Sequence, residues 1–256
     1  MDRMIDHSVI RETTWDGFRR IDVLVDGRDA VVVVPQTPAP GKPWVWRTEY
    51  FGAFAQADVA MAHKGWHVAY VNVSASFAAA NVLETLHEFQ RFVEAAYGLS
   101  PRPAIFGFSR AAHLAVRYAA RYPEKTGALY LDNPLFDIRS QIAAPGNSFH
   151  SDKEMLAYLA GFGMKVADAP AFEFSVLDKS DIIMKAGIPV LIVVGVADDV
   201  ILESENTALL ERRYHEAGKE ITIIRKPGCG HHPHSLEDPG PIVDFLLRNT
   251  IAGRKS

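Results

Sequence analysis

The protein has 256 residues and a formal net charge of −4, and 48% of its residues are hydrophobic. This length and composition fit a globular chain with a sizeable core, arranged as one large α/β domain or two small ones. Since no basic tract or acidic tail occurs, we expect neither nucleic acid nor a membrane surface as a partner. The chain starts without a signal-peptide pattern, and Cys229 is its only cysteine. We therefore expect a cytoplasmic protein without an internal disulfide.

Apolar runs of strand length alternate with segments of helical periodicity along most of the chain. Strands are predicted over residues 19–25, 30–34, 44–46, 66–73, 104–108, 127–131, 188–194 and 221–224. Helices are predicted over residues 54–63, 81–97, 109–122, 152–159, 206–217 and 241–248. The first strand alternates polar and apolar residues, which is typical of an antiparallel edge strand. The whole pattern predicts a mostly parallel sheet with helices on both faces.

One long segment, residues 133–179, interrupts this alternation with irregular sequence and a single predicted helix. Long insertions in compact folds are commonly functional, and this one follows the sixth predicted strand. We expect it to form a small cap over the carboxyl ends of the strands, where open α/β sheets bind ligands. The expected organisation is one domain, residues 1–256, with the cap inserted into it. The pattern gives no oligomeric state.

The segment Gly107-Phe108-Ser109-Arg110-Ala111 follows an apolar run and opens a predicted helix. A strand, tight turn and helix of this kind hold a serine at the tip of the turn, with small residues on both sides that allow close packing. The amide of Arg110, at the helix N-terminus, would face an oxyanion formed on a substrate. The ordinary alternative is that Ser109 caps the helix, which is the commoner role of serine at such a junction.

Two later loops offer the acid and the base that a nucleophilic serine needs. The first follows the predicted strand 188–194 and contains Asp198 and Asp199. The second is a glycine-rich loop before the last helix, with His231 and His232. Both loops open on the edge of the sheet where the serine is expected, so the three groups can meet. The spacing favours Asp198 as the acid and His231 as the base, with the neighbouring residues as alternatives.

His232 and His234 form a His-x-His pair, which is a common metal-binding spacing. The sequence shows no second cluster of metal-binding residues to supply further ligands, so we expect neither a metal nor another cofactor. His113, one turn after the serine, is expected to be a buried core histidine. Cys229 is expected to be a small buried residue, because nothing in the sequence places a base beside it.

These motifs resemble those of the α/β-hydrolase family, and the resemblance extends from about residue 30 to residue 250. It rests on Gly-Phe-Ser-Arg-Ala, on Gly-Val-Ala-Asp and on Gly-Cys-Gly-His, in the family's order and placement. The resemblance implies Ser109 as nucleophile, Asp198 as acid and His231 as base. Some members carry the acid after the sixth strand, which makes Asp132 an alternative acid. More narrowly, residues 41–47 and the segment that follows Gly230 resemble small bacterial hydrolases tied to the removal of carbohydrate esters.

Two departures from the family pattern concern the serine turn and the oxyanion hole. Ala111 stands where the family usually has glycine, a change that adds one methyl group. The usual His-Gly of the oxyanion loop is replaced by Arg47-Thr48-Glu49, after the third predicted strand. The resemblance implies that the Arg110 amide is one oxyanion donor. The second donor is then the amide of Glu49 or, one register earlier, the amide of Thr48.

The side chains expected to line the substrate pocket are those of Arg47, Trp46 and Phe108. Arg47 and Arg110 could together bind a substrate carboxylate, although a structural ion pair with Asp132 or Glu49 is the favoured alternative. The two tryptophans of the segment Trp44-Val45-Trp46 are expected on opposite faces of a central strand, with the second near the pocket.

The expected function is that of a serine-dependent carboxylic-ester hydrolase. It would act on a small-molecule ester through an acyl-enzyme and without a cofactor. The narrower resemblance favours a small acyl group on a carbohydrate as the substrate. Two alternatives stay open, because fold does not fix function. One is an amide, peptide or carbon–carbon bond hydrolase that uses the same three residues, and the other is a non-catalytic ligand-binding homologue.

Overall fold

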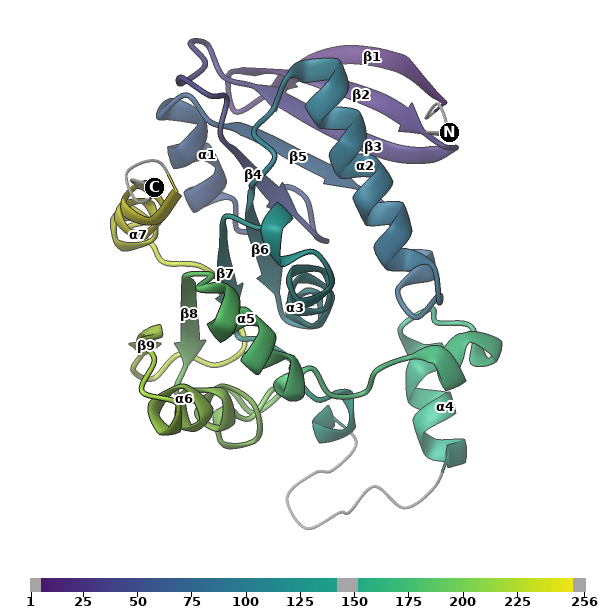
Figure 1. Ribbon diagram of the computed structural model, residues 1–256, viewed down its shortest axis with the longest axis vertical. Helices are drawn as coiled ribbons and strands as arrows, with labels where there is room; N and C mark the ends of the chain where they lie inside the picture. Colours follow the sequence, from purple (N-terminus) through teal and green to yellow (C-terminus); the bar gives the residue numbers. More distant parts are fainter. Residues whose placement is uncertain (1–5, 142–151, 251–256) are drawn as a thin grey trace.

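The structure is a computed structural model that describes residues 6–141 and 152–250. Its centre is a nine-stranded sheet in the order β1-β2-β3-β5-β4-β6-β7-β8-β9 (Figure 1). The strands are β1 His7–Trp15, β2 Phe18–Val25, β3 Arg28–Val34, β4 Trp44–Arg47, β5 His67–Val71, β6 Ala104–Phe108, β7 Ala128–Asp132, β8 Val190–Gly195 and β9 Thr222–Lys226. From β5 through β4 to β9 all neighbours are parallel, while β1, β2, β3 and β5 pair antiparallel. The predicted mostly parallel sheet is confirmed.

The N-terminal side of the sheet differs from the prediction. β2 was expected at the edge, but β1 pairs along its whole length, from His7 opposite Val25 to Trp15 opposite Phe18. Every side chain of β1 before Trp15 is exposed, so this strand has no apolar face that alternation could reveal. A register shift between Val9 and Arg11 marks a bulge, a device common at sheet edges.

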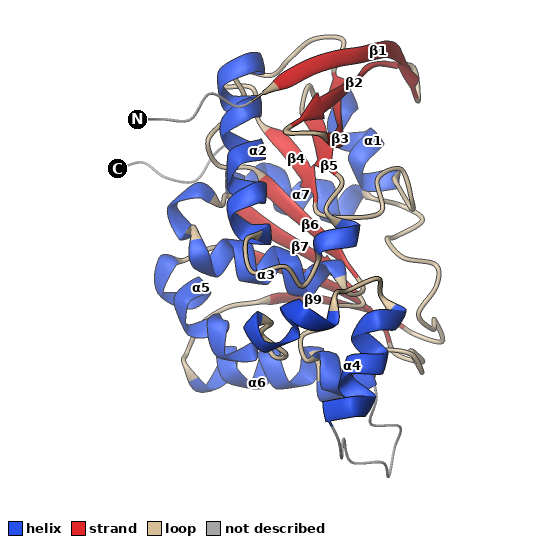
Figure 2. Ribbon diagram, turned by 90° about the vertical axis from the view of Figure 1, so that its right-hand side faces the viewer, coloured by secondary structure: helices blue, strands red, loops and turns tan. Residues whose placement is uncertain are grey.

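Helices cover both faces of the sheet (Figures 1 and 2). They are α1 Gln56–His63, α2 Val82–Tyr97, α3 Ala111–Arg121, α4 Asp152–Gly161, α5 Ser180–Ala186, α6 Thr207–Glu216 and α7 Gly240–Thr250. One apolar layer contains α1 and α7, and the other contains α2, α3, α5 and α6. Within the described ranges, no helix combines the length and the apolar character that crossing a bilayer requires.

The helix α2 shows how the sequence pattern produces this packing. Ala96, the last of the apolar residues predicted to recur at three- and four-residue steps, is exposed, whereas the other four are buried: Val82, Leu86, Phe89 and Val93. They form one stripe, which packs in the same apolar layer as the tryptophans of β4. Burial of each large side chain contributes about 1.5–3 kcal/mol to folding. The opposite side of the helix carries its charged residues.

The described parts of the insertion lie beside the sheet rather than continuing it. The helix α4 matches the predicted 152–159 helix and stands apart from the sheet-covering helices in Figure 1. Residues 142–151 of the predicted cap lie outside the described part of the chain. The segment after α4 returns to α3, where the Phe172 ring stacks on His113 with centroids 5.0 Å apart. The insertion is thus anchored on the helix that follows the serine.

Burial of His113 makes the folding free energy depend on pH. The residue is fully buried, and burial, with the nearby Arg117, lowers its pKa from 6.5 to about 3. A lowered pKa means that the neutral form is favoured in the folded state, so this stabilisation is complete above about pH 6.5 and is lost as the pH falls. Each pH unit below that value costs about 1.4 kcal/mol for this group. His113→Leu should remove this contribution to the slope, which denaturant unfolding at several pH values measures. An unchanged slope would show that the imidazole does not titrate on unfolding.

Candidate active site

Ser109 occupies a sharp turn between β6 and α3. Its φ is +52°, in the left-handed region that non-glycine residues rarely adopt. The Ser109 amide donates to the Asp132 carbonyl at 2.9 Å, which fixes the turn against the neighbouring strand β7. A side chain at Gly107 would place a Cβ 2.6 Å from Ala112 Cα, so the close passage of strand and helix requires glycine there. Ala111, in the position where the resemblance leads us to expect glycine, is fully buried in this packing.

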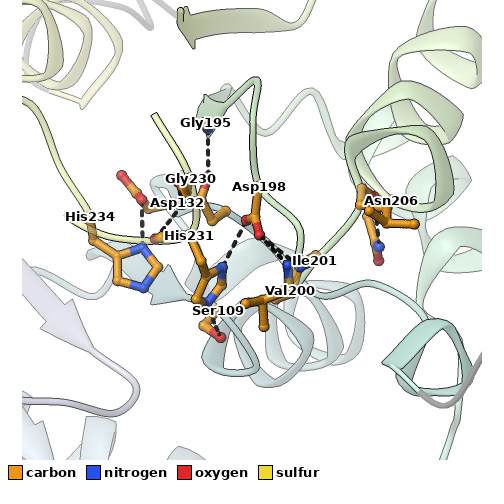
Figure 3. Close-up of polar contacts among 12 residues, drawn as sticks. Ser109, Asp132, Gly195, Asp198, Val200, Ile201, Asn206, Gly230, His231 and His234 are labelled. Carbon is orange, nitrogen blue, oxygen red and sulfur yellow. Dashed lines mark hydrogen bonds and ion pairs between the residues drawn. The ribbon is translucent and has the colours of Figure 1, made fainter. Parts of the chain in front are cut away.

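His231 lies between the Ser109 hydroxyl and the Asp198 carboxylate (Figure 3). Its Nε2 is 3.1 Å from Ser109 Oγ, and its Nδ1 is 2.7 Å from Asp198 Oδ2. Both the imidazole and the carboxylate are buried, with residue exposures of 8% and 6%. The sequence-predicted nucleophile, base and acid are therefore brought together in hydrogen-bonding order. Asp199, the alternative acid, is exposed.

The Asp198 carboxylate is held in its ionised form. Burial alone would raise its pKa, but the hydrogen bond from His231 and those from the amides of Ile201 and Val200 lower it below its usual value. The two amides donate to Oδ1 at 2.8 and 2.9 Å and leave Oδ2 for the imidazole. An ionised acid on Nδ1 fixes the tautomer in which Nε2 can accept a proton from Ser109.

Asn133, a residue that the sequence did not single out, fastens the loops that carry the acid and the base. Its Oδ1 accepts from the Gly195 amide at 2.7 Å, and its Nδ2 donates to the His231 carbonyl at 2.7 Å. The side chain is fully buried and follows directly on β7. Its place at the end of a predicted strand was the only signal, because both partners are distant in sequence.

Gly195 allows these two loops to touch. A Cβ at this position would lie 2.2 Å from the Gly230 carbonyl oxygen and 2.6 Å from that of Cys229. Gly195→Ala should therefore push the acid and base loops apart, destabilise the fold by about 2–3 kcal/mol and lower kcat. Chemical unfolding and ester hydrolysis measure the two effects. Gly230→Ala is the matched control, since its Cβ meets only Ala197 O at 3.6 Å and should cost less in stability. Equal destabilisation by the two substitutions would contradict this account.

No protein-family model and no curated protein matches this chain. Solved structures do match. The chain superposes on the acylaminoacyl peptidase of Pyrococcus horikoshii with a TM-score of 0.66 and 14% identity, over 99% of this chain and 43% of that one. A truncated carbohydrate esterase from gut microbiota gives a TM-score of 0.64 and 17% identity, over 87% of this chain and 90% of that one. Dipeptidyl peptidase 4 of Porphyromonas gingivalis gives a TM-score of 0.64 and 17% identity, over 96% of this chain and 35% of that one.

The chain has the α/β-hydrolase fold. It spans well under half the length of the peptidases it matches, at 35–43%. With the esterase, by contrast, the overlap extends over most of both chains. At these identities the likeness establishes the architecture alone, because one fold serves many chemistries.

The two residues predicted to supply the second oxyanion donor differ in the hydrogen bonds of their backbone amides. The Thr48 amide donates to the Phe106 carbonyl at 3.2 Å, so it is engaged in the sheet. The backbone amides of Glu49 and Arg110 donate no hydrogen bond to any of the described residues. The Glu49 carboxylate, almost fully buried, accepts two hydrogen bonds from the Arg110 guanidinium at 2.8 and 3.0 Å. This pair ties the segment after β4 to the residue after the serine.

Two residues predicted to contact the substrate, Arg47 and Trp46, are instead buried in the interior. Arg47 is 1% exposed and forms an ion pair with Asp58 at 3.2 Å, with its guanidinium carbon 4.0 Å from the centroid of the Phe108 ring. Trp46 is fully buried and stacks on Trp44, with ring centroids 5.4 Å apart. The predicted opposite faces were wrong, because residues two apart on a strand share a face. Neither Arg47 nor Trp46 can reach a substrate in the pocket.

A pocket of about 240 Å³ opens beside the Ser109 hydroxyl. Apart from Ser109 and His231, most of its wall consists of aromatic side chains, namely Tyr50, Phe54, Phe108, His232 and His234. Only Phe108 was predicted to contact the substrate. Tyr50 and Phe54 both have positive φ values, 56° and 47°, in the irregular segment between β4 and α1. The helix predicted from residue 54 begins at Gln56, which leaves the phenyl ring free to line the pocket.

A second buried acid–imidazole pair lies beside the first (Figure 3). Asp132 Oδ1 is 2.8 Å from His234 Nδ1, while Oδ2 accepts from the Tyr130 hydroxyl at 2.6 Å and from the Ser235 amide at 2.9 Å. Asp132, the alternative acid, is therefore bound to His234 and not to the imidazole that contacts the serine. This pairing bridges residues 102 apart, and the presence of Asp132 at a strand end was its only sequence signal.

Proposed function

We propose that this α/β-hydrolase is a serine esterase that cleaves small carboxylic esters through an acyl-enzyme on Ser109. The observation that carries the proposal is the unbroken chain of contacts from Ser109 Oγ through His231 to Asp198, at 3.1 and 2.7 Å. A serine hydroxyl is a weak nucleophile unless a base takes its proton, and an imidazole oriented by a carboxylate is such a base. The backbone strain at Ser109 supports the same role, because strained residues cluster at active sites.

In the proposed reaction, Ser109 Oγ attacks the ester carbonyl while its proton moves to His231 Nε2. The tetrahedral intermediate carries a negative oxygen, for which the amides of Arg110 and Glu49 are the proposed donors. The imidazolium, stabilised by Asp198, then protonates the departing alcohol and leaves an acyl-enzyme. Water, deprotonated by His231, attacks the acyl group and releases the carboxylic acid and the free serine. All atoms and protons are supplied by the ester, water and the protein.

The pocket supports a short acyl chain or a single sugar ring as the group bound next to the serine. Its volume of about 240 Å³ is small for a binding site. Its wall combines aromatic faces with polar ring edges, a combination that suits a sugar, which has apolar faces and hydroxyl rims. The similarity to a carbohydrate esterase over most of both chains adds support for an acylated carbohydrate. We therefore propose a small acyl ester of a carbohydrate as the substrate class.

The test compares esters and amides on the purified protein. We expect turnover of p-nitrophenyl acetate and release of acetate from an acetylated oligosaccharide, with rates falling as the acyl chain lengthens from acetate to octanoate. A fluorophosphonate should label the wild type on Ser109 and should not label Ser109→Ala. Cleavage of aminoacyl anilides with esters untouched would replace the esterase proposal with a peptidase. Absence of labelling and of any turnover would overturn the serine-hydrolase proposal.

A further inference from the structure

We propose that His231, His232 and His234 together form a binding site for Zn²⁺ or a similar divalent transition metal, and that the bound metal inhibits the enzyme. One ring nitrogen of each histidine lies within 4.8 Å of the others. The metal-binding half of this inference stands on the histidines alone. The inhibitory half rests on the proposed function. The sequence offered only a His-x-His pair, and the fold adds His231 as a third imidazole.

Two of the three imidazoles are already oriented as metal ligands are. His231 and His234 each have Nδ1 held by a buried carboxylate, at 2.7 Å from Asp198 and 2.8 Å from Asp132. This leaves Nε2 of each ring on the side away from its carboxylate, where that of His231 lies 3.1 Å from Ser109 Oγ, and Figure 3 shows the two rings side by side. A carboxylate behind the imidazole is the usual second contact of zinc-binding histidines, where it fixes the tautomer and increases ligand basicity.

His232 can complete the site because it is the exposed member of the cluster. Its ring is 4.9 Å from those of His231 and His234, and it stacks on Phe54 with an interplanar angle of 16°. Zinc binds nitrogen ligands at about 2.0–2.1 Å, so the three ring nitrogens must come closer to one another than the 4.8 Å within which they lie here. The exposed ring can turn to shorten them, while the two buried rings stay fixed on their carboxylates.

Charge and ligand type favour a cation of this class. Asp132 and Asp198 are both buried behind the imidazoles of His234 and His231, so these two carboxylates would attract a divalent ion in front of the rings. Three imidazole nitrogens suit zinc, copper or nickel and do not suit magnesium or calcium, which prefer oxygen. The fourth position would face the pocket and could hold water.

Inhibition follows from the use of a single lone pair. His231 Nε2 can either accept the Ser109 proton or bind the metal, and it cannot do both. A metal at the cluster would also occupy the pocket beside the serine. We therefore expect inhibition that is reversed by a chelator and is weakened by saturating substrate.

The binding test uses Ser109→Ala, which keeps the three histidines and needs no substrate. We expect it to bind one Co²⁺ with the visible absorption of a four-coordinate nitrogen-rich site, and Zn²⁺ to displace that ion. Adding His232→Ala should weaken the binding by at least about tenfold, because one of three nitrogen ligands is lost. Absence of Co²⁺ absorption, or the same affinity without His232, would overturn the site, whether or not the enzyme hydrolyses esters.

The inhibition test measures ester hydrolysis at neutral pH against free Zn²⁺, with each variant compared with its own metal-free rate. We expect half-inhibition of the wild type at micromolar Zn²⁺ and no inhibition by Mg²⁺. His232→Ala should need at least about tenfold more zinc, while the control His215→Asn, on the exposed side of α6, should match the wild type. Equal sensitivity of His232→Ala and wild type would overturn the proposal. Metal binding without any hydrolysis would leave the site standing and refute the proposed function.

Discussion

Replacing Ser109 with alanine should lower kcat for ester hydrolysis by about 10⁴ to 10⁶-fold and leave the protein folded. The Ser109 hydroxyl lies 3.1 Å from His231 Nε2 and lines the pocket, so its removal takes away the proposed nucleophile. Losses of this size follow removal of the serine from such a set, because the remaining groups no longer act as a unit. The residual rate would come from the oxyanion donors and from substrate binding alone.

The measurement is steady-state hydrolysis of p-nitrophenyl acetate, with thermal unfolding as the check on folding. Ser8→Ala, on the exposed strand β1, is the matched control and should retain wild-type kcat. A Ser109→Ala variant with more than about a tenth of the wild-type rate would refute the nucleophile assignment.

The second large effect is expected from Asp198→Asn, which should lower kcat by about 10³ to 10⁴-fold. The amide has nearly the volume of the carboxylate, but its N–H can donate a hydrogen bond to His231 Nδ1 and so favour the wrong tautomer. Ile201 and Val200 would still donate to the remaining carbonyl oxygen, so the loop should keep its shape. Loss of the negative charge also removes the stabilisation of the imidazolium.

The matched control is Asp199→Asn, one residue further along the same loop, where the side chain is exposed. Its kcat should stay within about threefold of the wild type, as is usual for a solvated carboxylate. The pH dependence of kcat/KM tests the same assignment of the acid, because its acid limb reports protonation of the base that the acid contacts. An activity loss in Asp199→Asn that equals that of Asp198→Asn would reassign the acid.

The elements that position the serine were predictable because each depends on residues close together in sequence. The β6 strand, the turn at Ser109 and the α3 helix form one continuous pattern of apolar residues and small residues. The loops with Asp198 and His231 likewise follow recognisable buried strands. In the structure they meet at the carboxyl ends of parallel strands, which is a property of the architecture.

Other features depend on contacts between distant residues, and local patterns could not reveal them. The β1 strand has no buried face, so its pairing with β2 leaves no periodic signal. Arg47 reads as a polar residue near the pocket, and only the fold shows that Asp58 draws it into the interior. Asn133 and His234 take their roles from partners about a hundred residues away. Side-chain environment, rather than residue type, decides these cases.

The hydrogen bonds of Asn133 join the end of β8 to the backbone of His231 through one amide side chain. We therefore expect the loops with Asp198 and His231 to keep the same geometry when an ester binds. Little reorganisation energy is then needed when an ester arrives, and crystals of an inhibited form should superpose closely on the ligand-free one around these residues. Differences between substrates would arise in the aromatic wall of the pocket, while the proton-transfer machinery would be the same for all of them.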